Sequence, residues 1–179
     1  NICQMPYSII SQNSEPPQSP RMNKIKIFEQ IKKELDLKYD LAKAAVKEAY
    51  ATATDKENIA ENKYDTTGLE ASYLVQGQAR RLEELQHSIN AFNQMTISSE
   101  KANLVALGTL LTVEENEKTS LLFVATQAGG LKVQYESTEI MVITLNSPIG
   151  KALAAKRVGN SAEVTIGRKT KTYIIRELF

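Results

Sequence analysis

The absence of glycine and proline between Met22 and Gly68 is the feature that most constrains the fold. Lys, Glu, Ala and Leu, which favour helix, make up much of this stretch. Its apolar residues recur at spacings of three and four, with Lys38 as a gap, at Phe28, Ile31, Leu35, Ala42, Ala45 and Ala49. This heptad pattern predicts a long helix that packs against one partner along a narrow seam.

A second run with the same spacing extends over residues 59–92, with Gln78 as its gap. Its apolar positions are Ala71, Val75, Leu82, Leu85, Ile89 and Phe92. Two such helices with a short break predict an antiparallel hairpin. We place the break at residues 53–58, where Thr54 and Glu57 match a capping box that would start the second helix. At 1.5 Å per residue the hairpin is about 50 Å long, so its far end must project into solvent or into a partner.

The pattern changes after residue 97 to short β-branched and apolar stretches separated by turn signals. These stretches lie at residues 104–113, 119–126, 131–135, 139–145, 163–166 and 170–178. Ser147 and Pro148 occupy the cap and first position of one short helix. The fold class is therefore predicted to be α+β, with an N-terminal antiparallel helical hairpin, or coiled coil, followed by a small antiparallel β domain with one short helix.

Three regions follow from these patterns. Residues 1–21 contain four of the five prolines and many Ser, Gln and Asn residues, and are predicted to be a disordered tail. Residues 22–97 form the predicted coiled-coil hairpin, and residues 98–179 form the β domain. No apolar run approaches 18 residues, and the tail lacks the apolar core of a signal peptide, so we expect a cytoplasmic protein with no membrane partner.

Composition removes several classes of function. The chain has one cysteine, Cys3, and one histidine, His87, which excludes an internal disulfide, a Cys-based zinc site and a His-rich metal cage. The 22 basic and 21 acidic residues give no overall field that would hold nucleic acid. Residues 55–70 nevertheless contain five acidic residues and two lysines, so the far end of the hairpin is locally acidic. If this chain takes part in chemistry, we expect it to lend a carboxylate to a partner's active site.

The order of motifs in the C-terminal half resembles the ending of the bacterial Gre factors, GreA and GreB. The matching segments read NSPIGKAL at 146–153, KRVG at 156–159, AEV at 162–164 and KTYII at 171–175. The N-terminal half also resembles the Gre coiled coil, through ENKY at 61–64 and the later Gln76-Gly77. Residues 61–74 are more similar to a GreA/GreB-like branch of proteobacterial proteins than to GreA itself. The resemblance covers about residues 22–179.

The resemblance implies an FKBP-like C-terminal domain that docks at the rim of the RNA polymerase secondary channel, through Ser147, Pro148, Lys151 and Arg157. The hairpin would enter the channel as a monomer and bring acidic tip residues to the polymerase active centre. There they would help hold a second Mg²⁺, so that the polymerase cleaves backtracked RNA. The factor would then be no enzyme alone and bind no cofactor alone. Its partner would be bacterial RNA polymerase, with nascent RNA contacted indirectly, and it would be nucleoid-associated through polymerase.

The tip departs from the family pattern. Gre tips read Asp-Leu-Lys-Glu-Asn, whereas this chain has Asp55-Lys56-Glu57-Asn58, without the leucine. In this register Asp55 and Glu57 would assist the metal, and in a second register only Glu61 would do so. Alternatively, Asp55 and Glu57 only cap the second helix and favour its dipole.

Other functions therefore stay open. Some Gre-like proteins bind the same channel without stimulating cleavage, and some inhibit transcription. The hairpin could instead be a structural coiled coil that mediates dimerisation. A prolyl isomerase is disfavoured, because the chain has no Trp and its β half has few aromatic residues.

Overall fold

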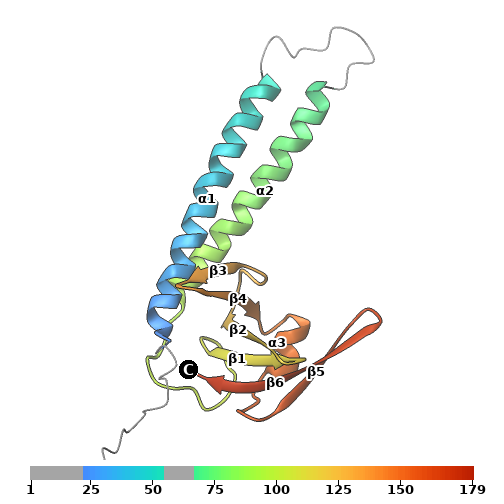
Figure 1. Ribbon diagram of the computed structural model, residues 1–179. Helices are drawn as coiled ribbons and strands as arrows, with labels where there is room; N and C mark the ends of the chain where they lie inside the picture. The colour runs from blue at the N-terminus through green and yellow to red at the C-terminus, as the bar shows by residue number, and fades with distance from the viewer. Residues whose placement is uncertain (1–21, 55–66) are drawn as a thin grey trace, which may run out of the picture.

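A helical arm stands on a small β domain in the computed structural model, which describes residues 22–54 and 67–179 (Figure 1). The arm consists of α1 (Lys24–Thr54) and α2 (Thr67–Gln94), which run antiparallel and pack along their length. The β domain contains six strands and one short helix, α3 (Pro148–Leu153). This arrangement confirms the predicted α+β fold class. The predicted tail, residues 1–21, lies outside the described residues.

The seam of the arm follows the predicted heptad positions. On α1 the buried apolar residues are Ile27, Phe28, Ile31, Leu35, Ala42 and Ala49. On α2 the facing positions include Leu85, Ile89 and Phe92. Large side chains fill the seam near the β domain, and alanines fill it near the far end of α1.

The predicted capping box is wrong at Thr54. Thr54 is the last residue of α1, and its hydroxyl donates to the carbonyl oxygens of Tyr50, at 2.9 Å, and Ala51, at 3.3 Å. A threonine hydroxyl can return to the preceding turn of its own helix as readily as it can cap the next one. Glu57 and residues 59–66, where the second helix was predicted to begin, lie outside the described residues. Within the described residues α2 begins at Thr67.

The six strands form one sheet in the order β3-β4-β2-β1-β6-β5. The strands are β1 (Leu110–Glu115), β2 (Lys118–Ala125), β3 (Lys132–Tyr135), β4 (Thr138–Thr144), β5 (Ser161–Ile166) and β6 (Lys169–Leu178). Four pairings are antiparallel, as predicted, but β2 and β4 pair in parallel, so the sheet is mixed. The reason is that β3 turns back at the sheet edge and delivers β4 beside β2 in the same direction.

The first predicted strand, residues 104–113, is too long at its start. Residues 104–109 form a loop that is tied to the segment after α3, because Val105 donates its N–H to Lys156 at 2.8 Å and accepts from Ala155 at 2.9 Å. Gly108 then takes a positive φ of 80°, which few other residues adopt readily. The apolar character of this loop reflects burial of Val105 and not pairing in the sheet.

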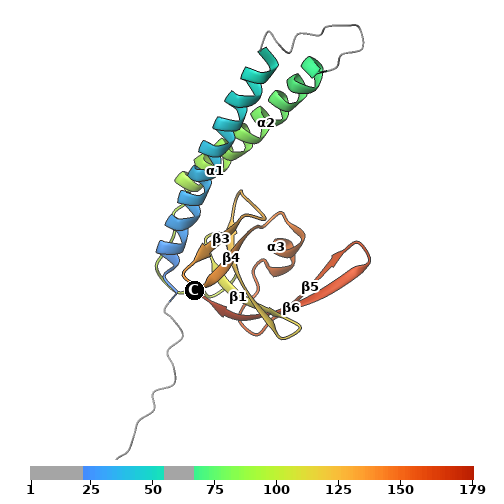
Figure 2. The same ribbon diagram turned by 45° about the horizontal axis from the view of Figure 1, so that its top comes forward.

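Alternate residues of a strand point to opposite faces of a sheet, and this sheet carries a core on each face. The arm packs on one face, where Ile27, Phe28, Ile31, Leu35 and Phe92 meet Leu110, Leu121, Phe123, Ala125, Val133, Ile140 and Val142. On the other face, Leu111, Val113, Leu122, Val124 and Ile175 meet Leu153 of α3 and Val105. Figure 2 shows α3 and the base of the arm separated by the sheet.

No helix within residues 22–54 and 67–179 combines the length and the apolarity that a membrane crossing requires.

Candidate functional site

The predicted acidic tip residues Asp55, Glu57 and Glu61 lie outside the described residues, so their geometry stays a prediction. The chain leaves α1 at Thr54 and re-enters at Thr67, and both helix ends lie at the far end of the arm, away from the β domain (Figure 1). Residues 55–66 of the sequence therefore join the two helices at the end of the arm that lies away from the β domain.

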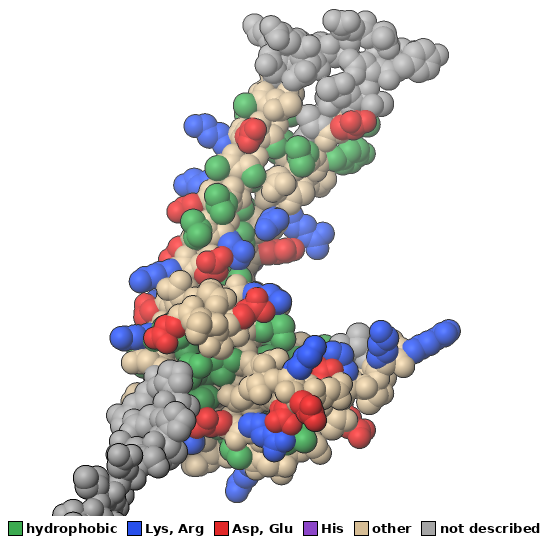
Figure 3. All heavy atoms as spheres, viewed as in Figure 1, with side chains coloured by type: hydrophobic (Ala, Val, Ile, Leu, Met, Phe, Trp, Pro, Cys, Tyr) green, Lys and Arg blue, Asp and Glu red, His purple; other side chains and the backbone are tan. Residues whose placement is uncertain are grey.

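Beyond its base, the arm also exposes large apolar side chains, which the sequence reasoning did not single out. They are Leu37, Leu41 and Tyr50 on α1, and Leu69, Tyr73 and Leu74 on α2. Figure 3 shows hydrophobic side chains at the surface along the arm, between charged residues of both signs. These positions lie off the heptad seam, so the sequence pattern could have indicated that their side chains are exposed.

Ser147, predicted as a docking residue, is engaged within the chain. Its hydroxyl donates to the carbonyl oxygen of Thr144 at 2.7 Å and accepts from the N–H of Gly150 at 3.2 Å. The side chain therefore caps α3 and ties it to the end of β4, as the sequence predicted for the cap. Pro148 follows at the first helical position and is exposed.

Gly150 is the residue that the close packing of α3 on the end of β4 requires. A Cβ atom at position 150 would lie 1.9 Å from the carbonyl oxygen of Thr144. Only glycine lets α3 approach the end of β4 this closely. Leu153, one turn later, is fully buried in the core on this face of the sheet. Several residues of the motif that resembles Gre factors therefore have a structural role in this chain.

Lys151 and Arg157, two of the predicted docking residues, are themselves exposed. Lys151 lies in the last turn of α3, and Arg157 lies in the turn that leads to β5. The backbone N–H of Arg157 donates to Oδ1 of Asn160 at 2.9 Å, so the turn is ordered without using the guanidinium. Val158, beside Arg157, also exposes about half of its surface. The structure thus presents two cations and one apolar side chain to solvent from neighbouring segments.

Ion pairs order the charged residues at the end of β1. Arg176 of β6 donates two hydrogen bonds to Glu114, at 2.8 and 2.9 Å. These bonds, together with the positive charge, lower the pKa of Glu114. Lys171 pairs with Glu115 at 2.9 Å, and the hydrogen bond to Glu115 raises the pKa of Lys171. Sequence reasoning did not find these pairs, because they join strands that are far apart in the chain.

Within residues 22–54 and 67–179, no three His, Cys, Asp or Glu side chains gather where they could hold a metal ion. His87 is exposed on α2. The predicted role of a Mg²⁺ ion shared with a partner is not tested by this geometry.

Comparison with known proteins places the chain in a family. No family model matches the sequence. The chain is 30% identical over 146 residues to transcription elongation factor GreA of Neorickettsia sennetsu, covering 81% of this chain and 87% of that protein. It is 26% identical to GreA of Mesorhizobium japonicum, covering 86% and 96%.

Among solved structures, GreA factor homolog 1 (Gfh1) of Thermus thermophilus matches with a TM-score of 0.35. That match has 18% identity and covers 83% of this chain and 94% of that one. The level of identity to the GreA proteins, over most of both chains, identifies the family. The chain belongs to the GreA family of transcription elongation factors.

Proposed function

We propose that this protein binds bacterial RNA polymerase, inserts its arm into the secondary channel and promotes cleavage of backtracked RNA by the polymerase. One observation carries the proposal: a slender arm projects from a folded base, and the sequence that joins its two helices, residues 55–66, is acidic. Membership of the GreA family supports the choice of partner.

The dimensions of the arm fit this task. The 31 residues of α1 extend about 46 Å at 1.5 Å per residue. Among the described residues, the β domain shares its core with the base of the arm, from Ile27 to Leu35 on α1. The far half can therefore enter a channel that is about as wide as two helices while the β domain stays outside.

The proposed chemistry belongs to the polymerase. A second divalent ion stabilises the attacking and leaving oxygens of a phosphodiester. Mg²⁺ in such sites uses one or two protein carboxylates beside water and phosphate. Asp55 and Glu57, or Glu61 in the other register, would lend these carboxylates. The β domain would dock through the exposed side chains of Lys151 and Arg157, and the capped start of α3 would hold them in place.

The test is transcript cleavage on stalled, backtracked complexes. We expect wild-type protein to accelerate cleavage and the Asp55→Ala/Glu57→Ala variant to lose the effect while still binding polymerase. If Glu61→Ala alone abolishes the effect, the second register holds. Protein that neither binds polymerase nor alters cleavage or elongation would refute the proposal.

A second candidate is a secondary-channel binder that modulates or inhibits transcription without cleavage. The tip sequence, which lacks the leucine of the Gre pattern, favours it. The same assay distinguishes it, because wild-type protein would then bind and slow elongation but leave the cleavage rate unchanged. A structural coiled coil predicts a dimer, whereas both polymerase-binding functions predict a monomer. Light scattering coupled to size exclusion separates these.

A further inference from the structure

One lysine at the base of the arm is buried and serves neither the proposed tip nor the proposed docking residues. Lys24, the first residue of α1, exposes only 7% of its surface. Its ammonium donates to the main-chain oxygens of Glu100 and Phe179, each at 2.9 Å. One side chain thus joins the start of the arm to two segments that lie 76 and 155 residues away in sequence.

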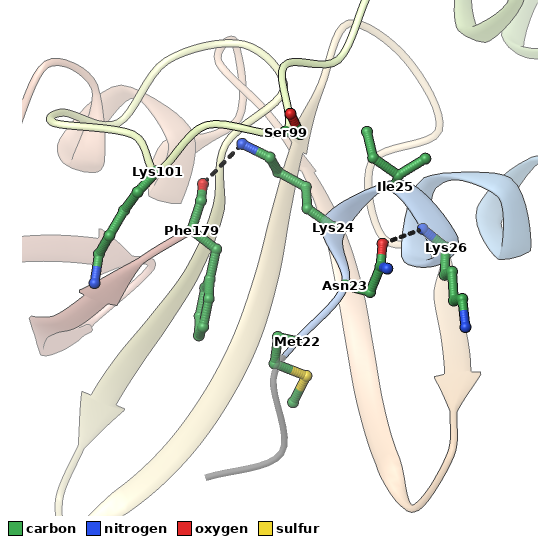
Figure 4. A pocket seen from close by; sticks show the side chains of 8 residues that line it. All are labelled: Met22, Asn23, Lys24, Ile25, Lys26, Ser99, Lys101 and Phe179. Carbon is green, nitrogen blue, oxygen red and sulfur yellow. Dashed lines mark hydrogen bonds between the residues drawn. The ribbon is translucent and has the colours of Figure 1, made fainter. Parts of the chain in front are cut away.

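The surroundings of Lys24 are drawn in Figure 4. A cavity of about 600 Å³ at this junction is lined by Met22, Ile25, Ser99 and Phe179, and by three lysines, Lys24, Lys26 and Lys101. The Lys24 side chain reaches inward to Phe179, whereas Lys26 and Lys101 point away from that contact. Lys101 pairs with Glu177 at 3.4 Å, so the loop before the sheet is also tied to β6. The two segments that Lys24 contacts are therefore also joined to each other by an ion pair.

A buried ammonium is an expensive way to hold two segments together. Desolvation lowers the pKa of Lys24, which shows that burial disfavours its charged form. Apolar residues of similar size often replace whole buried ion pairs with no loss of stability. What a hydrogen-bonded charge adds is direction, because hydrogen bonds weaken steeply with angle whereas apolar contacts do not.

Direction matters here because the arm is a long lever. A rotation of 5° at the base would displace the end of a 46 Å helix by about 4 Å. Groups that assist catalysis must be placed to within about 0.5 Å. The apolar contacts of the base run from Ile27 to Leu35 on α1, and Lys24 adds a directional contact one turn before them.

We propose that Lys24 is a positioning residue that fixes the direction of the arm relative to the β domain, through its hydrogen bonds to Glu100 and Phe179. The expected influence of Lys24 on polymerase rests on the proposed function, whereas its influence on the direction of the arm does not depend on that function.

The first experiment measures the arm in the isolated full-length protein. Spin labels on cysteines at Glu48 of α1 and Glu163 of β5, both exposed, report the distance between the two domains once Cys3 is replaced by serine. We expect a narrow distribution in wild type and at least a doubling of its width in Lys24→Met. Lys24→Arg, which keeps a long cationic donor, should restore most of the narrowness. Lys26→Met, on the same turn but exposed, is the matched control and should change nothing.

The second experiment uses the same unlabelled variants with polymerase. We expect Lys24→Met to lower the maximal effect of saturating factor on cleavage or elongation about tenfold, with less than a threefold change in the half-saturating concentration. Its melting temperature should stay within about 4 °C of wild type. If Lys24→Met loses more stability than this, Lys24→Gln, which keeps a polar group but is shorter, takes its place.

A distance distribution in Lys24→Met as narrow as in wild type would overturn the inference. A broadened distribution with an unchanged effect at saturation would support the positioning of the arm by Lys24 but overturn its part in the effect on polymerase. If wild-type protein has no effect on polymerase, the proposed function fails, while the distance measurement still decides whether Lys24 positions the arm.

Discussion

The two halves of the arm are built on the same heptad pattern but are held in different ways. Near the β domain, Phe28 stacks on Phe92 at 5.7 Å between ring centroids and approaches Phe123 of the sheet at 5.9 Å. In the far half the seam of α1 is filled by Ala42 and Ala49, while Tyr50 and Leu41 face solvent. The base is thus fixed by a shared core, and the far half keeps its largest apolar groups outside.

This difference suggests that the base of the arm determines stability and that the far half determines recognition. Burial of apolar surface is the main source of folding free energy, so residues of the base should dominate stability. Exposed tyrosine side chains contribute little to folding, but tyrosine is enriched among the residues that anchor protein interfaces. The far half is therefore the part that a channel wall would bury.

Truncation in the base should give the largest effect. Ile31 is fully buried between the arm and the sheet, and Ile31→Ala should lower the free energy of unfolding by about 2–5 kcal/mol. Leu41→Ala, at a position that is 63% exposed on the same helix, should cost less than about 0.5 kcal/mol. Urea unfolding followed by circular dichroism measures both. Equal losses would show that the two halves are not held differently.

Two glycines sharpen the contrast between the arm and the β domain. Gly150→Ala would place a methyl group against the Thr144 carbonyl and should cost about 1–3 kcal/mol or more through overpacking. Gly77 of α2 has no atom within 4 Å of an added Cβ, so Gly77→Ala should stabilise the helix by about 0.5–1 kcal/mol. Thermal unfolding of both variants tests the signs. Destabilisation by Gly77→Ala would mean that the far half of the arm has no room for an added methyl group.

Polymerase binding should depend on the exposed side chains of the far half of the arm, which contribute little to stability. Tyr73 is 65% exposed on α2, and Tyr73→Ser should leave the melting temperature unchanged while weakening polymerase binding about fivefold, equivalent to about 1 kcal/mol. Leu107→Ser, at an exposed apolar position of the β domain loop, is the control and should weaken binding less. A titration of fluorescently labelled polymerase against each variant measures the difference. Identical affinities for Tyr73→Ser and wild type would remove the recognition role from the far half.

The same contrast explains what the sequence could predict. The seam was predictable, because burial along a helix against one partner must repeat with the helical period. The exposed Tyr73 and Leu74 are visible in the sequence as apolar residues off that period, although their exposure needs the partner helix to be placed. The fold class followed in the same way from the change of period after the arm.

Contacts between distant segments were not predictable. The strand pattern carries no direction, so the parallel pairing of β2 with β4 was missed. The predicted cap at Thr54 failed because its hydroxyl had an equally good partner within α1. The cap that Ser147 forms was predictable from its motif, and its role as a docking residue stays a prediction. Lys24 gives no signal at all in the sequence, because its partners are main-chain oxygens.

The smallest effect should come from the surface of the sheet, where charge and not packing is at stake. The hydrogen bonds and charge of Arg176 lower the pKa of Glu114 in the folded protein. A carboxyl group whose pKa is lowered by folding stabilises the protein above its unfolded pKa, and that stabilisation is lost as the pH falls through the folded value. The melting temperature of wild type should therefore exceed that of Glu114→Gln at pH 7, and the difference should close as the pH falls below about 4.5.

Because this pair is exposed, 1 M salt should also reduce the difference. Arg176→Gln should follow the same pH dependence, and the double variant should add nothing to either single one. A difference that is as large at pH 3 as at pH 7 would mean that Glu114 acts through packing. The surface where β1 pairs with β6 would then be stabilised by packing, as the base of the arm is. In that case charge would not distinguish this surface from the base.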